Sequence, residues 1–353
     1  MKTYSYLYDS LCTRESIEFA YKKARKDKAS KQSVMEFDAS LKENLEQLHK
    51  ELNEMIYEPK PLKRLVVRDP KTRTIHASYF RDRIVHHLVV NTLEPIFEKI
   101  FIYDSCASRK NKGAHLAISR LEQFMRKISQ NGRAVRGEGR SKNNVQGYIL
   151  KADIRKYFDN VNHKVLINII KRKVKDGKII WLIRKILNNF NTPVTGQGMP
   201  LGNYTSQFFA NVYLNELDYF VKHELKAKYY IRYVDDFVIL HRSKKRLEYF
   251  KKRITEFLKG IKLELHPDKS NIIPLRNGLT FLGYKVFYHH KLLIKRNIHS
   301  MMRKIRFYKE GSISFEEIYE SFQGWEAYAK WSNSYKLRNK VKRQIVEILW
   351  NKI

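Results

Sequence analysis

Hydrophobic positions in the first sixty residues recur at the spacing of an amphipathic helix. Charged residues fill the positions between them, and Pro59 and Pro61 end the pattern because proline cannot continue a helix. We therefore predict a helical extension over residues 1–60. Its apolar stripe consists of Leu41, Leu45, Leu48, Leu52, Met55 and Ile56.

Between residues 61 and 147 the pattern changes from strand to helix. Residues 62–67 and 74–79 have strand composition and flank a basic turn that begins Asp69-Pro70, which predicts a hairpin. Residues 81–100 and 114–128 have helical periodicity, and a basic loop lies at 105–113. Residues 129–147 contain many Gly and Arg and few apolar residues, which predicts an inserted surface loop.

From residue 148 onward, strand and helix patterns alternate. We predict a strand at 148–154, helices at 156–173 and 179–189, a glycine-rich turn at 196–202, and a long helix at 203–225 with Asn203 as its cap. Strand patterns at 229–240, a helix at 244–259, further strands to 287 and three basic helices from 297 follow. This order predicts an α+β protein with a small antiparallel sheet and a separate helical bundle.

The charge balance indicates a polyanionic partner. The 353 residues include 70 Lys and Arg against 36 Asp and Glu, giving a formal charge of +34. Nucleic acid is favoured over a membrane surface, because the chain lacks an apolar run of about 18 residues and a signal-peptide core. Cys12 and Cys106 have no metal-ligand spacing, so we expect reduced thiols in a cytoplasmic protein.

Candidate chemistry centres on Tyr233-Val-Asp-Asp236, where two strand-like runs meet at adjacent carboxylates. Asp153, at the end of an apolar strand, is a candidate for a third carboxylate; the alternative is a surface Asp that merely ends the strand. Oxygen ligands fixed at strand ends suit a pair of Mg2+ ions in nucleotidyl transfer. Adjacent strand residues point to opposite faces, so Asp235 and Asp236 are not expected to be equivalent ligands.

Further motifs follow one another in the order found in right-hand polymerases. Over about residues 60–350 the chain resembles the reverse transcriptases of bacterial retroelements. The matching segments are Lys71-Thr-Arg73, Arg81-Asp-Arg83, Phe101-Ile-Tyr-Asp-Ser105, Leu150-Lys-Ala-Asp153-Ile-Arg-Lys-Tyr-Phe158, Gly198-Met-Pro-Leu-Gly202, Tyr233-Val-Asp-Asp236, His266-Pro-Asp-Lys269 and Phe281-Leu-Gly-Tyr284.

The resemblance implies a right-hand polymerase with fingers at 61–147, which include the 129–147 loop, a palm at 148–288 and a helical thumb at 289–353. Within the palm, the helices near 162–197 are associated with fingers and palm. It also implies two Mg2+ ions, with Mn2+ as a substitute, bound by Asp153 and Asp235, more weakly by Asp236, and by the carbonyl of Ile154. Lys269 resembles the lysine suggested to protonate the leaving pyrophosphate, and a solvated turn residue is the alternative.

The resemblance further implies sites for dNTPs and for template RNA and its RNA/cDNA hybrid. Lys71 and Arg73 match the family's triphosphate-binding pair, although a solvated basic turn is the alternative. Phe158 matches the aromatic gate that excludes a 2′-hydroxyl, against the alternative of a core Phe. The remaining expected contacts are Leu201, Gly202 and Gln207 for the nucleotide, and Arg81, Arg109, Gly283, Tyr284 and Arg338 for template and primer.

The segment Pro200-Leu-Gly-Asn-Tyr-Thr-Ser206-Gln207 is most similar to the reverse transcriptases of diversity-generating retroelements. Many relatives carry Gln at the position of Leu201, and loss of that amide predicts weaker base discrimination. The resemblance implies errors at template adenines and a small basic accessory protein that forms a pentameric ring. Alternatives are a group II intron-like or phage-defence reverse transcriptase without targeted mutagenesis, and a non-catalytic RNA-binding scaffold.

Overall fold

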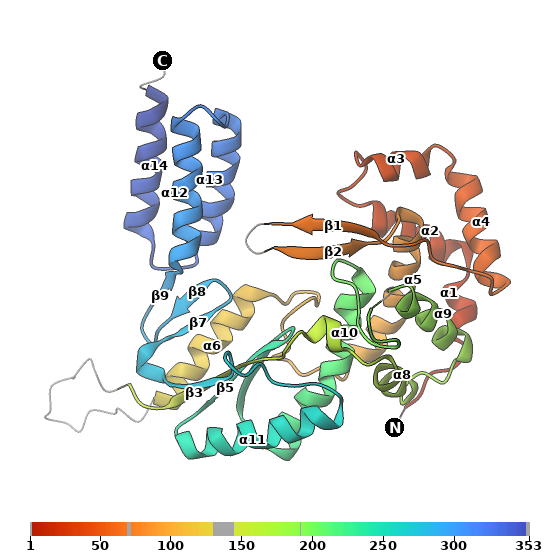
Figure 1. Ribbon diagram of the computed structural model, residues 1–353, viewed down its shortest axis with the longest axis horizontal. Helices are drawn as coiled ribbons and strands as arrows, with labels where there is room; N and C mark the ends of the chain where they lie inside the picture. The colour runs from red at the N-terminus through yellow and green to blue at the C-terminus, as the bar shows by residue number, and fades with distance from the viewer. Residues whose placement is uncertain (1, 69–71, 130–144, 191, 351–353) are drawn as a thin grey trace, which may run out of the picture.

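The computed structural model describes residues 2–68, 72–129, 145–190 and 192–350 (Figure 1). Lys71 and most of the predicted 129–147 loop lie outside the described residues. The elements form an antiparallel palm sheet with helices on both faces, a helical N-terminal part and a three-helix bundle, which confirms the predicted α+β class. No helix in the described ranges is long and apolar enough to cross a membrane.

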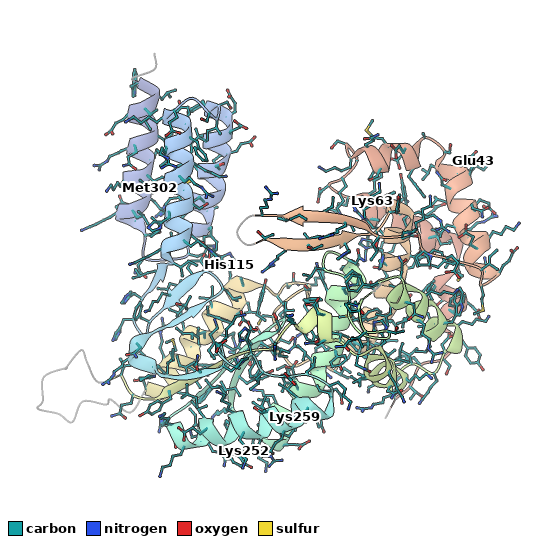
Figure 2. All side chains as sticks on the ribbon, in the orientation of Figure 1. Glu43, Lys63, His115, Lys252, Lys259 and Met302 are labelled. Carbon is teal, nitrogen blue, oxygen red and sulfur yellow. The ribbon has the colours of Figure 1, made fainter. Side chains whose placement is uncertain are left out.

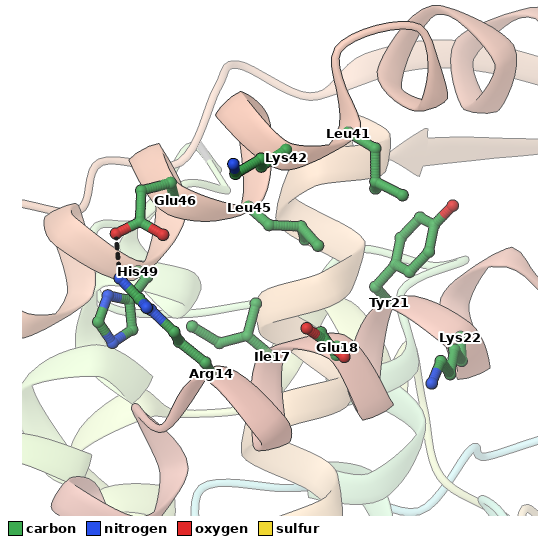
Figure 3. A pocket seen from close by; sticks show the side chains of 10 residues that line it. All are labelled: Arg14, Ile17, Glu18, Tyr21, Lys22, Leu41, Lys42, Leu45, Glu46 and His49. Atoms are coloured by element: carbon green, nitrogen blue, oxygen red, sulfur yellow. Dashed lines mark hydrogen bonds and ion pairs between the residues drawn. The ribbon is translucent and has the colours of Figure 1, made fainter.

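The N-terminal part is built from four short helices rather than one continuous pattern. Thr13 begins the second of them, its side chain accepting a hydrogen bond from the Ser16 amide at 3.2 Å. Arg14 and Glu46 form an ion pair at 2.7 Å across a pocket between the second and fourth helices (Figure 3). The helices are α1 (Leu7–Leu11), α2 (Arg14–Arg25), α3 (Gln32–Asp38) and α4 (Leu41–Asn53).

The two strands of the predicted hairpin pair with each other and project from the N-terminal half toward the C-terminal bundle (Figure 1), and residues 69–71 of the predicted basic tip lie outside the described residues. Its strand β1 is exposed along its whole length, so the hairpin is held at its base rather than by a core of its own. The following helix α5 is mostly buried and packs against α2 and α10. These elements are β1 (Lys63–Val67), β2 (Arg73–Ala77), α5 (Phe80–Phe97) and α6 (Ala114–Ser129).

The palm sheet has the strand order β4-β5-β3-β6, with every neighbouring pair antiparallel. Ile149 and Val238 point to the face covered by α6, whereas Leu150 and Ile239 point to the face covered by α11, as the period of two requires. Both faces are thus buried. The strands are β3 (Tyr148–Asp153), β4 (Tyr229–Tyr233), β5 (Asp236–His241) and β6 (Asn271–Pro274), and α11 spans Lys244–Gly260.

Two helix predictions in the palm need correction. The helix predicted at 156–173 is divided at Asn162, whose side chain caps a second helix by accepting from the Val165 amide at 3.0 Å. Asn203 begins its helix without a side-chain cap, because its carboxamide oxygen instead accepts hydrogen bonds from the backbone and hydroxyl of Ser78. The helices are α7 (Tyr157–Asn160), α8 (His163–Lys171), α9 (Gly177–Asn188) and α10 (Tyr204–Tyr219), which continues as a π turn (Phe220–Glu224).

A small sheet connects the palm to the C-terminal bundle. Its strands are β7 (Leu279–Phe281), β8 (Tyr284–Val286) and β9 (Lys291–Leu293), and the bundle helices are α12 (Lys295–Lys309), α13 (Phe315–Ala329) and α14 (Tyr335–Trp350). The prediction of three basic helices is wrong for α13, which carries four Glu and neither Lys nor Arg. His115 at the start of α6 stacks on Trp331 at a centroid distance of 3.9 Å and connects the bundle to α6.

Candidate active site

The strand register brings the predicted carboxylates to one edge of the palm sheet. Asp153 at the end of β3 lies directly opposite Asp236 at the start of β5, and directly opposed residues of an antiparallel pair project to the same face. Asp236 in turn pairs with Tyr233, which leaves Val234 and Asp235 as a two-residue turn. The predicted hairpin with both carboxylates at or beside its tip is therefore present.

The turn at this tip is strained and negatively charged. Val234 has φ +56°, a conformation that β-branched residues rarely adopt. Burial of the carboxyl group, together with repulsion from Asp153 and Asp236, raises the pKa of Asp235 to about 6, and Lys269 opposes the rise. The carboxylates of Asp153 and Asp236 thus repel that of Asp235 at this edge. The side chains of Asp235 and Asp236 would point to opposite faces in a regular strand, but Asp235 lies in the turn.

A buried ion pair beneath the turn holds its backbone. The guanidinium of Arg232, in β4, donates to both carboxylate oxygens of Asp218 at 2.7 and 2.6 Å, and neither side chain is exposed. Its remaining nitrogen, Nη1, donates to the carbonyl of Val234 and to the Asn211 side chain, both at 3.1 Å. Since Val234 O belongs to the turn itself, Arg232 fixes the backbone that presents Asp235.

The segment that precedes Lys269 pairs with the end of β3 on the side away from β5. His266 donates its backbone N–H to the carbonyl of Asp153 at 2.7 Å, and the backbone N–H of Arg155 donates to the backbone carbonyl of Glu264 at 2.9 Å. In an antiparallel pair successive residues direct their backbone groups to opposite sides, so the carbonyl of Ile154 faces the β4–β5 side. Lys269 Nζ lies 3.6 Å from Asp153 Oδ2, which places the predicted general acid beside a predicted ligand.

The donor set at this edge fits Mg2+ in chemistry. The side chains grouped there are carboxylates, and oxygen ligands suit hard cations. Within the described ranges, no group of three or more His, Cys, Asp or Glu side chains is placed so that it could hold a metal ion.

The glycine-rich turn connects Phe158 to the β1–β2 hairpin. The carbonyl of Phe158 accepts from the Met199 amide at 2.7 Å, and the carbonyl of Leu201 accepts from the His76 amide at 3.1 Å. A Cβ at Gly202, where φ is +107°, would lie 2.6 Å from Ile75 Cγ2. Glycine therefore lets the turn approach β2 closely, and Phe158, Leu201 and Gly202 come together at this joint.

The other predicted nucleotide contacts occupy separate positions. Arg73 is the exposed first residue of β2, and Lys71 lies outside the described residues. Gln207 is exposed on α10 and accepts a hydrogen bond from the Ser108 hydroxyl at 3.3 Å, which links it to the predicted basic loop rather than to Leu201.

Three predicted template contacts are engaged within the chain. Arg81 pairs with Glu51 and with Asp82, and burial lowers its pKa. Arg109 is 5% exposed and pairs with Glu98 while donating to two loop carbonyls. Arg338 pairs with Glu326 at 3.1 Å. These arginines have a structural role here, and template contact by them remains a prediction.

Gly283 and Tyr284 lie where the palm meets the bundle. Gly283 has φ +87°, and the hydroxyl of Tyr284 donates to the carbonyl of Tyr328 at 2.8 Å. In return, the Tyr328 hydroxyl donates to the carbonyl of Leu282 at 3.2 Å. Tyr284 is fully buried, so it packs this joint, and contact with the primer remains a prediction for the neighbouring Gly283.

Sequence reasoning missed the residues that support the hairpin carrying Asp235 and Asp236. Besides Asp218 and Asn211, Arg232 contacts the Ser105 hydroxyl at 3.0 Å, and the Tyr230 hydroxyl donates to Asp218 at 2.7 Å. One signal was available, because Arg232 is a charged residue in the middle of an otherwise apolar and aromatic strand.

Comparison with known proteins agrees with this geometry. The family model "Reverse transcriptase (RNA-dependent DNA polymerase)" matches residues 61–286. Protein YkfC of Escherichia coli (strain K12) is 26% identical over 307 residues, which cover 76% of each chain. Group II intron-encoded protein LtrA of Lactococcus lactis subsp. cremoris is 25% identical over 371 residues, covering 84% of this chain and 59% of LtrA.

A more distant relative, the putative COX1/OXI3 intron 2 protein of Saccharomyces cerevisiae, is 23% identical over 308 residues, covering 69% of this chain and 34% of its own length. The chain thus spans less than two thirds of both intron proteins. The family match contains β3, the aspartate hairpin and the segment that carries Lys269. This chain therefore belongs to the reverse transcriptase (RNA-dependent DNA polymerase) family.

Proposed function

We propose that this chain extends a primer along template RNA with dNTPs, using Asp153 and Asp235 as its principal Mg2+ ligands and Asp236 as a weaker one. The observation that carries the proposal is the edge where Asp153 faces Asp236 in register, with Asp235 on the adjoining turn. Mutual repulsion of these carboxylates favours a bound cation over a metal-free state. This arrangement also favours catalysis over the alternative of an idle RNA-binding scaffold.

The residues around this edge have distinct proposed roles. When bound, Mg2+ would stabilise charge on the attacking and leaving oxygens of an in-line displacement. The Ile154 carbonyl would add a backbone ligand, and Arg232 keeps Asp235 in place through Val234. Lys269, 3.6 Å from Asp153, would donate a proton to the leaving pyrophosphate.

Nucleotide selection is proposed for the joint between palm and hairpin. Phe158 is partly buried and its ring packs edge-on against Tyr157 at 5.4 Å, so its position is restrained. A restrained ring beneath the sugar would exclude a 2′-hydroxyl and favour dNTPs. Arg73 at the start of β2, with Lys71 beyond it, would bind the triphosphate, since guanidinium groups hold phosphates through two hydrogen bonds.

Within the family, we propose a diversity-generating retroelement enzyme that makes adenine-mutagenised cDNA with a ring-forming accessory protein. Support comes from Leu201, whose aliphatic side chain supplies no hydrogen bond where many relatives carry Gln, and from Ser206 and Gln207. The second candidate is a group II intron-type reverse transcriptase without targeted mutagenesis. The similarity to LtrA, a group II intron-encoded protein, favours it.

Primer extension on a defined RNA template, followed by sequencing of the cDNA, tests both the proposed DNA synthesis and the proposed mutagenesis at adenines. Leu201→Gln should lower the error frequency at template adenines, because a buried amide penalises mispaired partners. Leu201→Met is the matched control, since it keeps an apolar side chain of similar volume and should keep the parent error pattern. RNA-templated synthesis with few errors in the parent, unchanged by Leu201→Gln, would favour the intron-type alternative.

A further inference from the structure

A basic pocket lies beside the catalytic edge, and none of the proposed catalytic groups lines it. It is a cavity of about 600 Å³ between the end of β3, the start of α8 and the end of α11. Arg155, Lys156, Lys259 and Lys262 line it, and Glu264 is the one carboxylate in its lining. The pocket therefore has a formal excess of three positive charges.

The wall of this pocket is held by hydrogen bonds between separate segments. Asn160 donates from its side chain to the Arg155 carbonyl at 2.9 Å and accepts from the Gln197 side chain at 3.1 Å. The carboxamide oxygen of Asn162 accepts from the Val165 amide at 3.0 Å. The carboxamide oxygens of Asn160 and Asn162 are thus both engaged. Each side chain keeps at least one N–H group that can donate to a ligand.

Charge and shape together define the chemistry of a ligand. A concave site lined by cations and amide donors suits an anion rich in acceptor oxygens. The cavity is open on one side, and its volume accommodates a compact polyphosphate, whereas a nucleic-acid backbone requires a groove that continues over several nucleotides. Glu264 offsets one of the four positive charges and pairs with Arg155 at 3.6 Å.

The location connects the pocket to the proposed reaction. Arg155 and Lys156 follow directly after Asp153 and Ile154, and Glu264 belongs to the segment that pairs with them and continues to Lys269. A ligand in the pocket would thus contact the same backbone that presents the proposed metal ligands.

We propose that this pocket is an accessory polyphosphate site, which takes either the triphosphate of an incoming nucleotide or the released pyrophosphate. The choice of ligand rests on the proposed function, whereas the existence of an anion site rests on the pocket alone. Arg73 of the β1–β2 hairpin is not among the lining residues of the pocket.

Calorimetric titration of inorganic pyrophosphate into the full chain, in the presence of EDTA, tests the site without turnover. The double variant Lys259→Gln with Lys262→Gln should weaken binding about tenfold, since it removes two exposed charges from the lining. Lys252→Gln is the matched control. Lys252 is exposed on α11 seven residues, or about two turns, before Lys259, and lies outside the lining (Figure 2).

The control should keep the parent affinity to within about twofold, because the interaction of an exposed charge falls off within a Debye length. Equal affinity in the parent and the double variant, or an equal loss in Lys252→Gln, would overturn the proposal. A polymerase-inactive parent that still binds pyrophosphate through these lysines would contradict the proposed function and leave the pocket assignment intact.

Steady-state kinetics then distinguishes the two sources of polyphosphate. If the pocket receives incoming nucleotides, the double variant raises the KM for dNTPs. If it receives the product, pyrophosphate inhibits the double variant less strongly while the KM for dNTPs stays constant. Unchanged KM and unchanged inhibition in a variant that polymerises would overturn the link to the reaction.

Discussion

Arg232 and Asp218 form an ion pair with both side chains fully buried, directly beneath the turn that carries Asp235. The pair joins α10 to β4, and the same guanidinium donates to the carbonyl of Val234. Removal of one partner leaves an uncompensated charge in the core, which is more costly than loss of a surface pair. Stability and hairpin geometry should therefore both depend on Arg232.

Arg232→Met should lower the free energy of unfolding by about 3 to 5 kcal/mol, because Asp218 would remain buried without a cation. Urea denaturation followed by circular dichroism measures the change. A loss below about 1 kcal/mol, the range of exposed pairs, would contradict the role of this pair in stability.

Arg232→Lys tests the position of the turn separately from the positive charge beside Asp218. Lysine keeps a cation beside Asp218 but lacks the planar fork that reaches Asp218 and Val234 together, so the turn should move while the protein stays folded. We expect kcat for RNA-templated dNTP incorporation to fall about a hundredfold, the cost of a misplacement near 1 Å. Binding of template RNA should change little. Full kcat in this variant would show that the hairpin needs no guanidinium beneath it.

Asp235 should make the metal-free protein less stable as pH rises. Its folded pKa of about 6 exceeds the ordinary carboxyl value of 3.8, so between these values the unfolded chain has lost the proton that the folded chain retains. Stability from this group is complete below about pH 4 and is lost as pH rises through about 6. At about pH 7.5 in EDTA, Asp235→Asn should gain on the order of 2 kcal/mol.

Thermal or urea unfolding of both proteins across this pH range measures the effect. Added Mg2+ should reduce the difference in stability between the two proteins. Mg2+ that binds the native state stabilises the parent, and it stabilises the variant much less because the variant lacks one of the proposed ligands. The same pH slope in Asp235→Asn and in the parent would be inconsistent with a raised carboxyl pKa.

Gly202 and Gly196 provide a matched pair for testing the joint between palm and hairpin. Both have positive φ, but a Cβ at Gly196 meets nothing within 4 Å, whereas at Gly202 it meets Ile75 at 2.6 Å. Gly196→Ala should cost about 1 kcal/mol from backbone strain alone. Gly202→Ala should cost about 1 to 3 kcal/mol more, from overpacking against β2.

Only Gly202→Ala should also raise the KM for dNTPs, because it displaces β2, which begins with the proposed triphosphate ligand Arg73. Adding Ile75→Ala to Gly202→Ala should recover part of the lost stability. Equal losses in the two single variants would indicate that close approach to Ile75 is unimportant.

Local patterns predicted much of this protein. Apolar periodicity predicted the positions of most helices and strands. The motif order predicted that Asp153 and the Tyr233–Asp236 turn lie in the same sheet. Both predictions depend on residues that are close together in the sequence, and such residues determine where a strand or a turn forms. The acidic character of α13 follows from its own residues, which include four Glu and neither Lys nor Arg, although the bundle as a whole is basic.

The partners of individual arginines could not be predicted in the same way. Whether Arg81, Arg109 or Arg232 meets solvent, nucleic acid or a carboxylate depends on residues brought close only by the tertiary fold. Arg109 reaches Glu98 from the next loop, and Arg232 contacts Ser105 from a segment 127 residues away. Neither residue spacing nor net charge encodes such contacts.

RNA-templated incorporation of dNTPs by the parent chain, compared with Asp153→Asn, tests the central assignment most directly. The variant removes one carboxylate charge at nearly constant volume, and circular dichroism verifies that it folds. The account predicts Mg2+-dependent extension by the parent and a loss of about a thousandfold or more in Asp153→Asn, as expected for a group that holds the catalytic metal. Extension by the variant at the parent rate would contradict the assignment of this edge as the active site.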